Sequence, residues 1–126
     1  MLDICGNEIR FTQGNSAVIG ITPIDTSTGS PIELEGTDKV LFTVKTRYGV
    51  TVIQKILTAA DADEQGALIC TLNPDDTINL SPGQYEYDCL YVASGDQAVT
   101  FISSAFYIVR AVGKYTDVNG GDSNGD

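Results

Sequence analysis

The chain contains no histidine. Histidine is the commonest general base, nucleophile activator and transition-metal ligand at neutral pH, so its absence excludes Ser–His–Asp and Cys–His catalysis. Chemistry based on lysine or carboxylate groups stays formally open, but no residue pattern indicates a site for it. We therefore expect a protein that is not an enzyme, with no catalytic residues and no cofactor.

Basic residues are also scarce. The chain has 7 Lys plus Arg against 17 Asp plus Glu, which gives a net charge of -10. This charge opposes the electrostatic attraction that supplies most non-specific affinity for nucleic acid. We expect neither nucleic acid nor an anionic membrane surface as a partner. The acidic excess has two interpretations, solubility or a surface for a cation or a basic protein, and we favour the first.

Long apolar runs are missing as well. No window approaches the roughly 18 consecutive apolar residues that a membrane-spanning helix requires, so we expect a soluble chain. The residues from Met1 to Cys5 include neither a basic region nor an apolar run. We therefore expect no secretory signal peptide, and a protein that is made in the cytoplasm.

Cysteine is limited to Cys5, Cys70 and Cys89, an odd number without a C-x-x-C spacing. This pattern argues against both a disulfide framework and a zinc site, and it favours reduced thiols. Cys70 and Cys89 fall on the inward parity of predicted strands, which allows them to be neighbours across a core and to behave as small apolar residues. Cys5, near a terminus, is expected to be more exposed.

What the sequence does contain is a succession of short β-favouring runs between Glu8 and Arg110. Gly, Pro, Asn and Asp clusters separate these runs, and no stretch sustains a helical apolar period. This pattern predicts an all-β fold, an immunoglobulin-like antiparallel β-sandwich of about seven strands with one short helical turn. The length and the 42% apolar content suit a single core. We expect the sandwich to occupy residues 1–113 and residues 114–126 to be a disordered acidic tail or linker.

The predicted strands differ in how clearly their faces are defined. They are Glu8–Thr12, Ser16–Ile24, Asp38–Thr46, Thr51–Leu57, Ala67–Leu72, Gln84–Val92 and a closing strand from about Gln97 to Val112. We expect Ser16–Ile24 to be a central, buried strand because it is more continuously apolar than the first run, with Ala17, Val18, Ile19 and Ile21. The inward face of Thr51–Leu57 stays ambiguous. The alternation of the closing strand slips, which predicts a bulge near Ser103–Ser104.

A helix-start signal follows the fifth predicted strand. Asn73 suits the N-cap, Pro74 suits the first helical position, and the carboxylates of Asp75 and Asp76 suit the positive end of the helix dipole. The signal predicts a single helical turn from Pro74 to Asn79.

A tyrosine stripe follows the turn at Ser81–Gly83. Tyr85, Tyr87 and Tyr91 share one parity with Cys89, while Glu86 and Asp88 lie on the other. If it faced outward, the stripe would be a platform for binding a sugar or a protein. The acidic residues on the opposite parity favour an inward stripe with its hydroxyls at the rim.

Two acidic clusters raise the question of a metal site. Asp117 and Asn119 suit the first ligand positions of a calcium loop, but Gly121 occupies the third and no bidentate Glu follows. Asp61, Asp63 and Glu64 are typical of a solvated loop. We therefore predict no metal site.

The segment from Gly66 to Val92 resembles the signature of the N-terminal domain of phage baseplate upper proteins. The resemblance rests on Leu72, Asn73, Pro74, Asp75, Asp76, Thr77, Leu80, Pro82, Gly83, Tyr85, Tyr87 and Asp88. The upstream order is similar too, with a turn at Thr28–Leu34 and a strand at Val40–Lys45, and the similarity spans roughly Glu8 to Val112.

This family comprises immunoglobulin-like modules of tail, baseplate and other virion proteins in phages and prophages of Gram-positive bacteria. The resemblance implies a non-enzymatic structural or assembly module of a tail, baseplate or fibre, made in the host cytoplasm and incorporated into the virion. Its implied partners are other virion or tail proteins. Unpaired sheet edges are natural assembly surfaces, so a homo-oligomer stays open. The alternative is a bacterial surface adhesion or carbohydrate-binding module, which the missing signal peptide disfavours.

Overall fold

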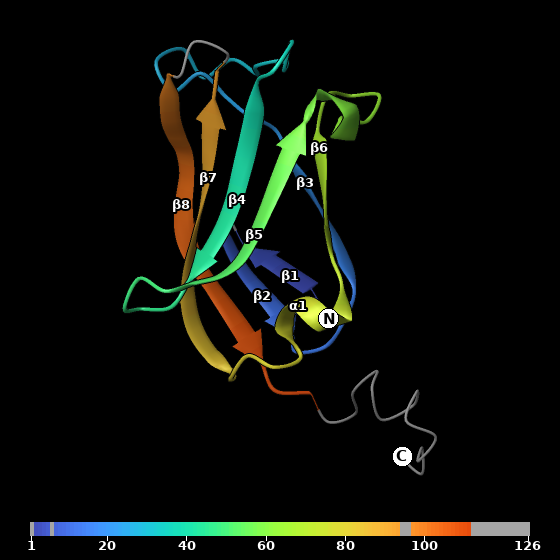
Figure 1. Cartoon of the computed structure of the whole chain (residues 1–126), viewed down its shortest axis with the longest axis vertical. Helices are drawn as coiled ribbons and strands as arrows, with labels where there is room; N and C mark the ends of the chain where they lie inside the picture. Colours follow the sequence, from blue (N-terminus) through green and yellow to red (C-terminus); the bar gives the residue numbers. More distant parts are fainter. Residues whose placement is uncertain (1, 6, 94–96, 112–126) are drawn as a thin grey trace.

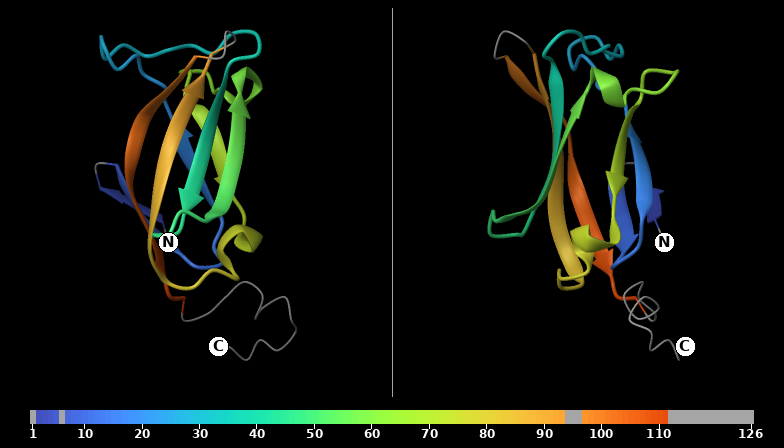
Figure 2. Two further views of the ribbon diagram at one scale, coloured as in Figure 1. Left: turned by 60° about the vertical axis from the view of Figure 1, so that its left-hand side comes forward. Right: turned by 45° about the vertical axis from the view of Figure 1, so that its right-hand side comes forward.

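Eight strands in two layers make up the computed structural model, which describes residues 2–5, 7–93 and 97–111 (Figure 1). The elements are β1 (Leu2–Cys5), β2 (Glu8–Thr12), β3 (Ala17–Ile21), β4 (Lys39–Lys45), β5 (Thr51–Thr58), the 3-10 turn η1 (Ala59–Asp61), β6 (Leu68–Leu72), α1 (Pro74–Thr77), β7 (Gly83–Val92) and β8 (Ala98–Val109). One sheet has the order β1-β2-β8-β7-β4-β5, and the other pairs β3 with β6. The predicted all-β sandwich is confirmed, and Figure 2 shows its two layers from the side.

The strand order follows the immunoglobulin pattern. β4, β7 and β8 are neighbours in the larger sheet, as strands C, F and G are in that fold, and β3 and β6 pair as strands B and E do. One pairing departs from the antiparallel expectation, because β2 runs parallel to β8, with Ile9 opposite Phe106. β2, near the start of the chain, and β8, the last strand described, therefore lie side by side and run in the same direction.

Two strand predictions need correction. β1 was not predicted, because it is only four residues long and the alternation of Leu2 and Ile4 is too short to stand out in the sequence. It pairs antiparallel with β2. The central position expected for the second run is wrong, because β3 has a single strand partner in the two-stranded sheet. Its apolar run hides an alternation in which Ile19 and Ile21 are buried while Val18 is 57% exposed.

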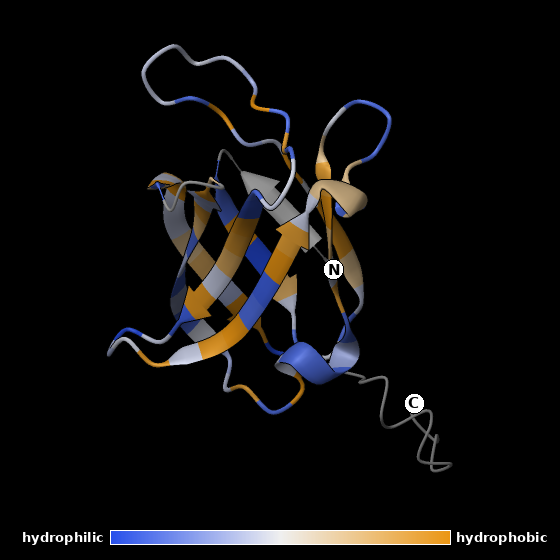
Figure 3. Cartoon of the chain, turned by 45° about the horizontal axis from the view of Figure 1, so that its top comes forward, coloured by the Kyte–Doolittle hydropathy of each residue, from blue (hydrophilic) through white to orange (hydrophobic). Residues whose placement is uncertain are grey.

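The core lies between the sheets and follows the period of two that strands impose on side chains. Val40, Phe42 and Val44 of β4 are fully buried. Figure 3 shows apolar and polar residues alternating along the strands. At the centre is an aromatic cluster of Phe11, Phe42, Tyr87 and Phe106, in which Phe106 contacts the other three rings at centroid distances of 6.3–6.4 Å.

The ambiguous parity of β5 is resolved by its position at the edge of the larger sheet. Ile53 and Leu57 are buried, whereas Ile56 faces out. Lys55 has the same parity as the two buried residues, and this charged residue is what obscured the apolar face in the sequence. A hairpin tip precedes β5, where Gly49 adopts φ +87° and donates its N–H to the Thr46 carbonyl.

The bulge in β8 lies two residues before its predicted position. Cys89 is opposite Ile102 and Leu90 is opposite Thr100, so Phe101 is the extra residue. Ser103 and Ser104 pair regularly, so the predicted bulge is present but does not lie at these two residues. Ser104 has the same parity as Ile102 and the buried Phe106, so it lies on the inward side of the strand. Because Ser104 is polar, the sequence did not show that the inward alternation already begins at Ile102. The predicted tail of residues 114–126 lies outside the described residues.

Candidate functional site

The residues that the family resemblance singles out gather at one corner of the sandwich, between β6 and β7 (Figure 1). The predicted helical turn is confirmed as α1, although it ends at Thr77 rather than Asn79. Asn73 is the N-cap with an extended backbone, and Pro74 occupies the first turn. The Asp76 carboxylate accepts the backbone N–H of Asn73 at 2.7 Å, while Asp75 lies exposed in the same turn. At this corner a backbone N–H at the start of the helix is therefore hydrogen-bonded by a side chain of the same turn.

Two side chains attach this corner to the β2–β3 turn. Thr77 is fully buried, and its hydroxyl oxygen accepts the backbone N–H of Gly14 at 2.8 Å. The Gln13 amide nitrogen donates to the carbonyl oxygen of Leu80 at 2.8 Å. Gly14 adopts φ +77°, a conformation that glycine tolerates best. The contacts join residues more than 60 positions apart, and they close the core at this end.

An ion pair connects the corner to the edge of the larger sheet. The Lys55 Nζ lies 2.9 Å from Asp76 Oδ2, and both side chains are about one quarter exposed, at 25% and 21%. Asp76 therefore serves both the helix start and the contact with β5. Partly exposed ion pairs stabilise folds by about 1 kcal/mol or less, so this contact mainly sets geometry.

We predict that Thr77→Val lowers the free energy of unfolding by about 2 kcal/mol, because it leaves the buried Gly14 N–H without an acceptor. Urea unfolding followed by circular dichroism measures the change. Thr71→Val, at an exposed position of β6, is the matched control and should alter stability by less than about 0.5 kcal/mol. Equal effects of the two substitutions would show that the Thr77 contact contributes nothing specific.

The tyrosine stripe faces inward with its hydroxyls at the rim, as predicted. Tyr85 and Tyr87 are buried. The Tyr85 hydroxyl donates to the Ser81 carbonyl at 2.8 Å, which is the tyrosine-corner contact of immunoglobulin-like domains, and the Pro82-Gly83 turn lies inside that loop. The Tyr87 hydroxyl donates to the Asn7 carbonyl, and that of Tyr91 lies 3.3 Å from Asp38 Oδ2. The stripe is thus used within the fold.

Removing the tyrosine-corner hydroxyl in Tyr85→Phe should lower the free energy of unfolding by about 1 kcal/mol, the usual net value of one such hydrogen bond. Thermal unfolding can measure this difference. Tyr48→Phe removes a hydroxyl from a side chain that is 93% exposed, and it should leave the melting temperature unchanged. If Tyr85→Phe also left it unchanged, the corner contact would not stabilise the fold.

The two described cysteines are buried free thiols, as predicted, with Cys70 on β6 and Cys89 on β7. Burial raises the pKa of Cys70 to about 11 and that of Cys89 to about 12, and charge on Cys70 would raise the Cys89 pKa further. Thiolates are the reactive form of cysteine, so these groups are inert in the folded state. For Cys5 the structure describes only the backbone, at the end of β1.

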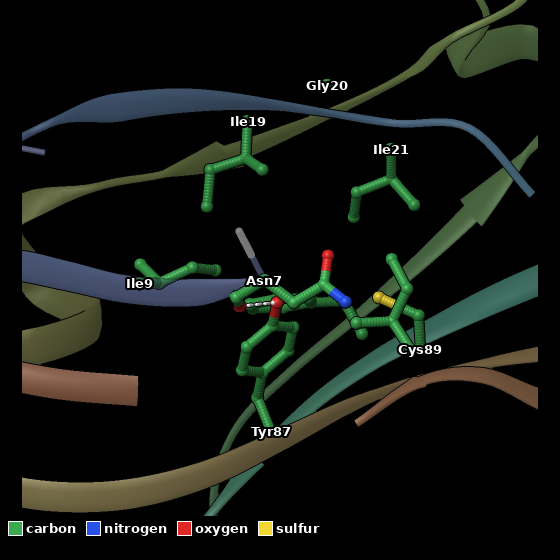
Figure 4. Close-up of a pocket in the computed structure, with 9 residues that line it drawn as sticks. Asn7, Ile9, Ile19, Gly20, Ile21, Tyr87 and Cys89 are labelled. Atoms are coloured by element: carbon green, nitrogen blue, oxygen red, sulfur yellow. Dashed lines mark hydrogen bonds between the residues drawn. The ribbon is translucent and has the colours of Figure 1, made fainter. Parts of the chain in front are cut away.

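An apolar cavity of about 110 Å³ lies between the layers (Figure 4). Its walls come from the β1–β2 turn and from five strands, β2, β3, β4, β7 and β8. They comprise Asn7, Ile9, Ile19, Gly20, Ile21, Phe42, Tyr87, Cys89 and Ile102. Sequence analysis did not predict this cavity, because no pattern in the residues signals an unfilled volume. A second, open groove of about 330 Å³ runs between the β4–β5 turn, at Tyr48, and the Pro82–Gly83 turn.

The acidic loop after β5 is organised by local backbone contacts. Asp61 Oδ2 accepts the Thr58 N–H at 2.8 Å, and Asp63 Oδ1 accepts the N–H groups of Gln65 and Ala67. Within residues 2–5, 7–93 and 97–111, no three histidine, cysteine or acidic residues are grouped so as to hold a metal ion. The other acidic segment, with Asp117, Asn119 and Gly121, lies outside the described residues.

No family model matches the chain, and no curated protein matches it. Among the described residues, no helix has the length and apolar content needed to cross a membrane.

Proposed function

We propose that the chain is a non-enzymatic assembly module of a phage or prophage virion, in a tail, baseplate or fibre. The observation that supports this most is the use of the resemblance residues in the corner. Asp76 caps a helix start and pairs with Lys55, Thr77 accepts a buried N–H, and Tyr85 closes a tyrosine corner. These contacts all stabilise the fold. An assembly module needs a stable fold of this kind, because its surfaces must be held in place for other subunits to bind.

The surface of the module offers features that suit assembly with other virion or tail proteins. Tyr48 and Val50 are both exposed at the β4–β5 turn, and tyrosine is enriched at the centres of protein–protein interfaces. The larger sheet has an outer strand at each end, β1 and β5, and unpaired edges are a second kind of assembly surface. The net charge of -10 suits partners with basic surfaces.

A bacterial surface adhesion or carbohydrate-binding module is the second candidate, and it depends on an outward tyrosine platform. Tyr85 and Tyr87 face the core, with hydroxyls that donate to backbone carbonyls. The stripe therefore offers no stacking surface for a sugar, and we place this candidate second.

The test is the protein content of purified particles. Particles of the phage or prophage that encodes the chain are purified through a density gradient and analysed by mass spectrometry. The proposal predicts that the chain co-purifies at a fixed ratio to the tail proteins. Particles from a strain without the gene are the control and should lack the chain and be defective in tail assembly. Absence of the chain from intact wild-type particles would overturn the proposal.

A further inference from the structure

The outer edge of β3 has no strand partner among the described residues, because β3 pairs only with β6. The strand reads Ala17-Val18-Ile19-Gly20-Ile21, without a charge or a proline. Natural proteins usually protect an exposed edge with such residues, or with an inward-pointing charge. β5, at the edge of the other sheet, has that protection in Lys55, which pairs with Asp76. The β3 edge is therefore unprotected as well as unpaired.

The apolar cavity lies directly beside this edge. Ile19 and Ile21 of β3 point into it from one side, and Tyr87 and the Cys89 sulfur face it from the other (Figure 4). Its volume of about 110 Å³ is somewhat smaller than the roughly 150 Å³ of an apolar cavity that admits benzene. The volume suits one aliphatic side chain. Tyr87, the polar group on this wall, already donates its hydroxyl to the Asn7 carbonyl.

We propose that β3 accepts an extended strand from another virion subunit, which pairs with its outer edge and places one aliphatic side chain in the cavity. In this mode of recognition, main-chain hydrogen bonds supply affinity and pockets for alternate side chains supply specificity. The donated strand would become the third strand of the smaller sheet. The proposal rests on the proposed function for the identity of the donor, and on the edge and the cavity for the binding mode.

Charge selects the chemistry of the donor. The chain has a net charge of -10, so a second copy would bring a second charge of -10 to the contact. A segment with lysine or arginine beside its strand is complementary instead, and electrostatic complementarity selects partners and speeds their association. The donor is therefore a different subunit whose strand is aliphatic at one inward position and basic at its flanks.

The experiment uses the full chain and a synthetic probe peptide, in which Thr alternates with Val, Leu occupies the central position and Lys flanks both ends. A matched peptide has Ala in place of Leu. Fluorescence anisotropy measures affinity, and hydrogen exchange locates the amides that become protected. We expect saturable binding of the Leu peptide, and new protection of the alternate amides of residues 17–21 that point away from β6. Affinity for the Ala peptide should be about tenfold weaker because less apolar surface is buried.

Three variants of the chain test the position of binding. Val18→Lys places a charge on the exposed face of β3, and it should weaken the Leu peptide about tenfold by repelling the lysine flanks. Thr71→Lys changes the residue paired with Val18, on the strand away from the free edge, and should leave affinity unchanged. Cys89→Met fills the cavity and should remove the difference between the Leu and Ala peptides. Circular dichroism verifies that each variant is folded.

Three results would overturn the proposal, namely no binding of the Leu peptide, equal binding of both peptides to the unmodified chain, or protection on β6 without protection on β3. These failures are distinct from failure of the proposed function. Peptide binding by a chain that is absent from particles would keep the strand-accepting edge and reject the virion role. If the chain is present in particles but binds neither peptide, the virion role is kept and the strand-accepting edge is rejected.

Discussion

Phe106→Ala lowers the free energy of unfolding by about 4 kcal/mol, which we expect to be the largest effect of a single side-chain truncation in this fold. Phe106 is fully buried, and its ring contacts Phe11, Phe42 and Tyr87. Its strand pairs with β2 on one side and β7 on the other. The truncation therefore removes buried apolar area and opens a cavity where three strands meet. Urea unfolding at neutral pH measures the loss.

Phe106→Leu is the matched control, because it keeps most of the apolar volume and should cost about 1 kcal/mol. A second control, Tyr48→Ala, truncates an aromatic side chain that is exposed, and it should change stability by less than about 0.5 kcal/mol. A loss of under about 1 kcal/mol for Phe106→Ala would contradict the central position of the aromatic cluster.

Alkaline pH should destabilise the fold steeply. The Cys70 and Cys89 thiols have a pKa of 9.0 when unperturbed, and burial raises these values to about 11 and about 12 in the folded chain. Above pH 9 the unfolded chain releases protons that the folded chain retains, so the free energy of unfolding falls as pH rises. Each buried thiol contributes a slope of about 1.4 kcal/mol per pH unit. The contribution is fully present below pH 9 and is lost as pH rises through about 11–12.

Burial also raises the pKa of the Tyr87 hydroxyl, from 10.0 to about 12, and this shift acts in the same direction at higher pH. The measurement is urea unfolding at a series of pH values from 8 to 11, in a Cys5→Ser background that prevents cross-linking through that thiol. The double variant Cys70→Ala with Cys89→Ala should be less stable at every pH in this range. The quantity that tests the prediction is the slope of the free energy of unfolding against pH, which should become clearly shallower in the double variant. An unchanged slope would show that the thiols do not remain protonated in the folded chain.

Much of the fold follows from local patterns in the sequence. Val40, Phe42 and Val44 alternate cleanly with polar or less buried residues, so the face of β4 was predictable. The helix start at Asn73 and Pro74 combines backbone and charge preferences that point to one structure. The inward direction of the tyrosine stripe followed from Glu86 and Asp88 on the opposite parity.

Other features depend on contacts between distant residues, which a single sequence does not display. The parallel pairing of β2 with β8 and the small size of the β3–β6 sheet are set by topology, not by the residues of any one strand. Thr77 and Gly14 are 63 positions apart, and neither shows a local sign of the hydrogen bond between them. Lys55 left the inward face of its strand ambiguous in the sequence, whereas in the structure its parity is inward and its amine reaches Asp76.

The candidate site was predictable only as a set of structural residues. The corner motif was identified in the sequence, and the structure adds what each residue contacts. The cavity beside β3 had no signal, because Ile19, Ile21 and Cys89 have the same apolar pattern whether or not the space between them is filled. The strand-accepting edge therefore emerged only from the arrangement of the two sheets.

The virion role is tested most directly by cross-linking mass spectrometry of intact, purified particles. The exposed lysines Lys39 and Lys45 of β4 provide amine groups for the reagent. The account predicts reproducible cross-links from these lysines to a second virion protein, at sites that stay the same between preparations. Particles in which the chain is absent, or in which it is cross-linked only to host proteins, would contradict it.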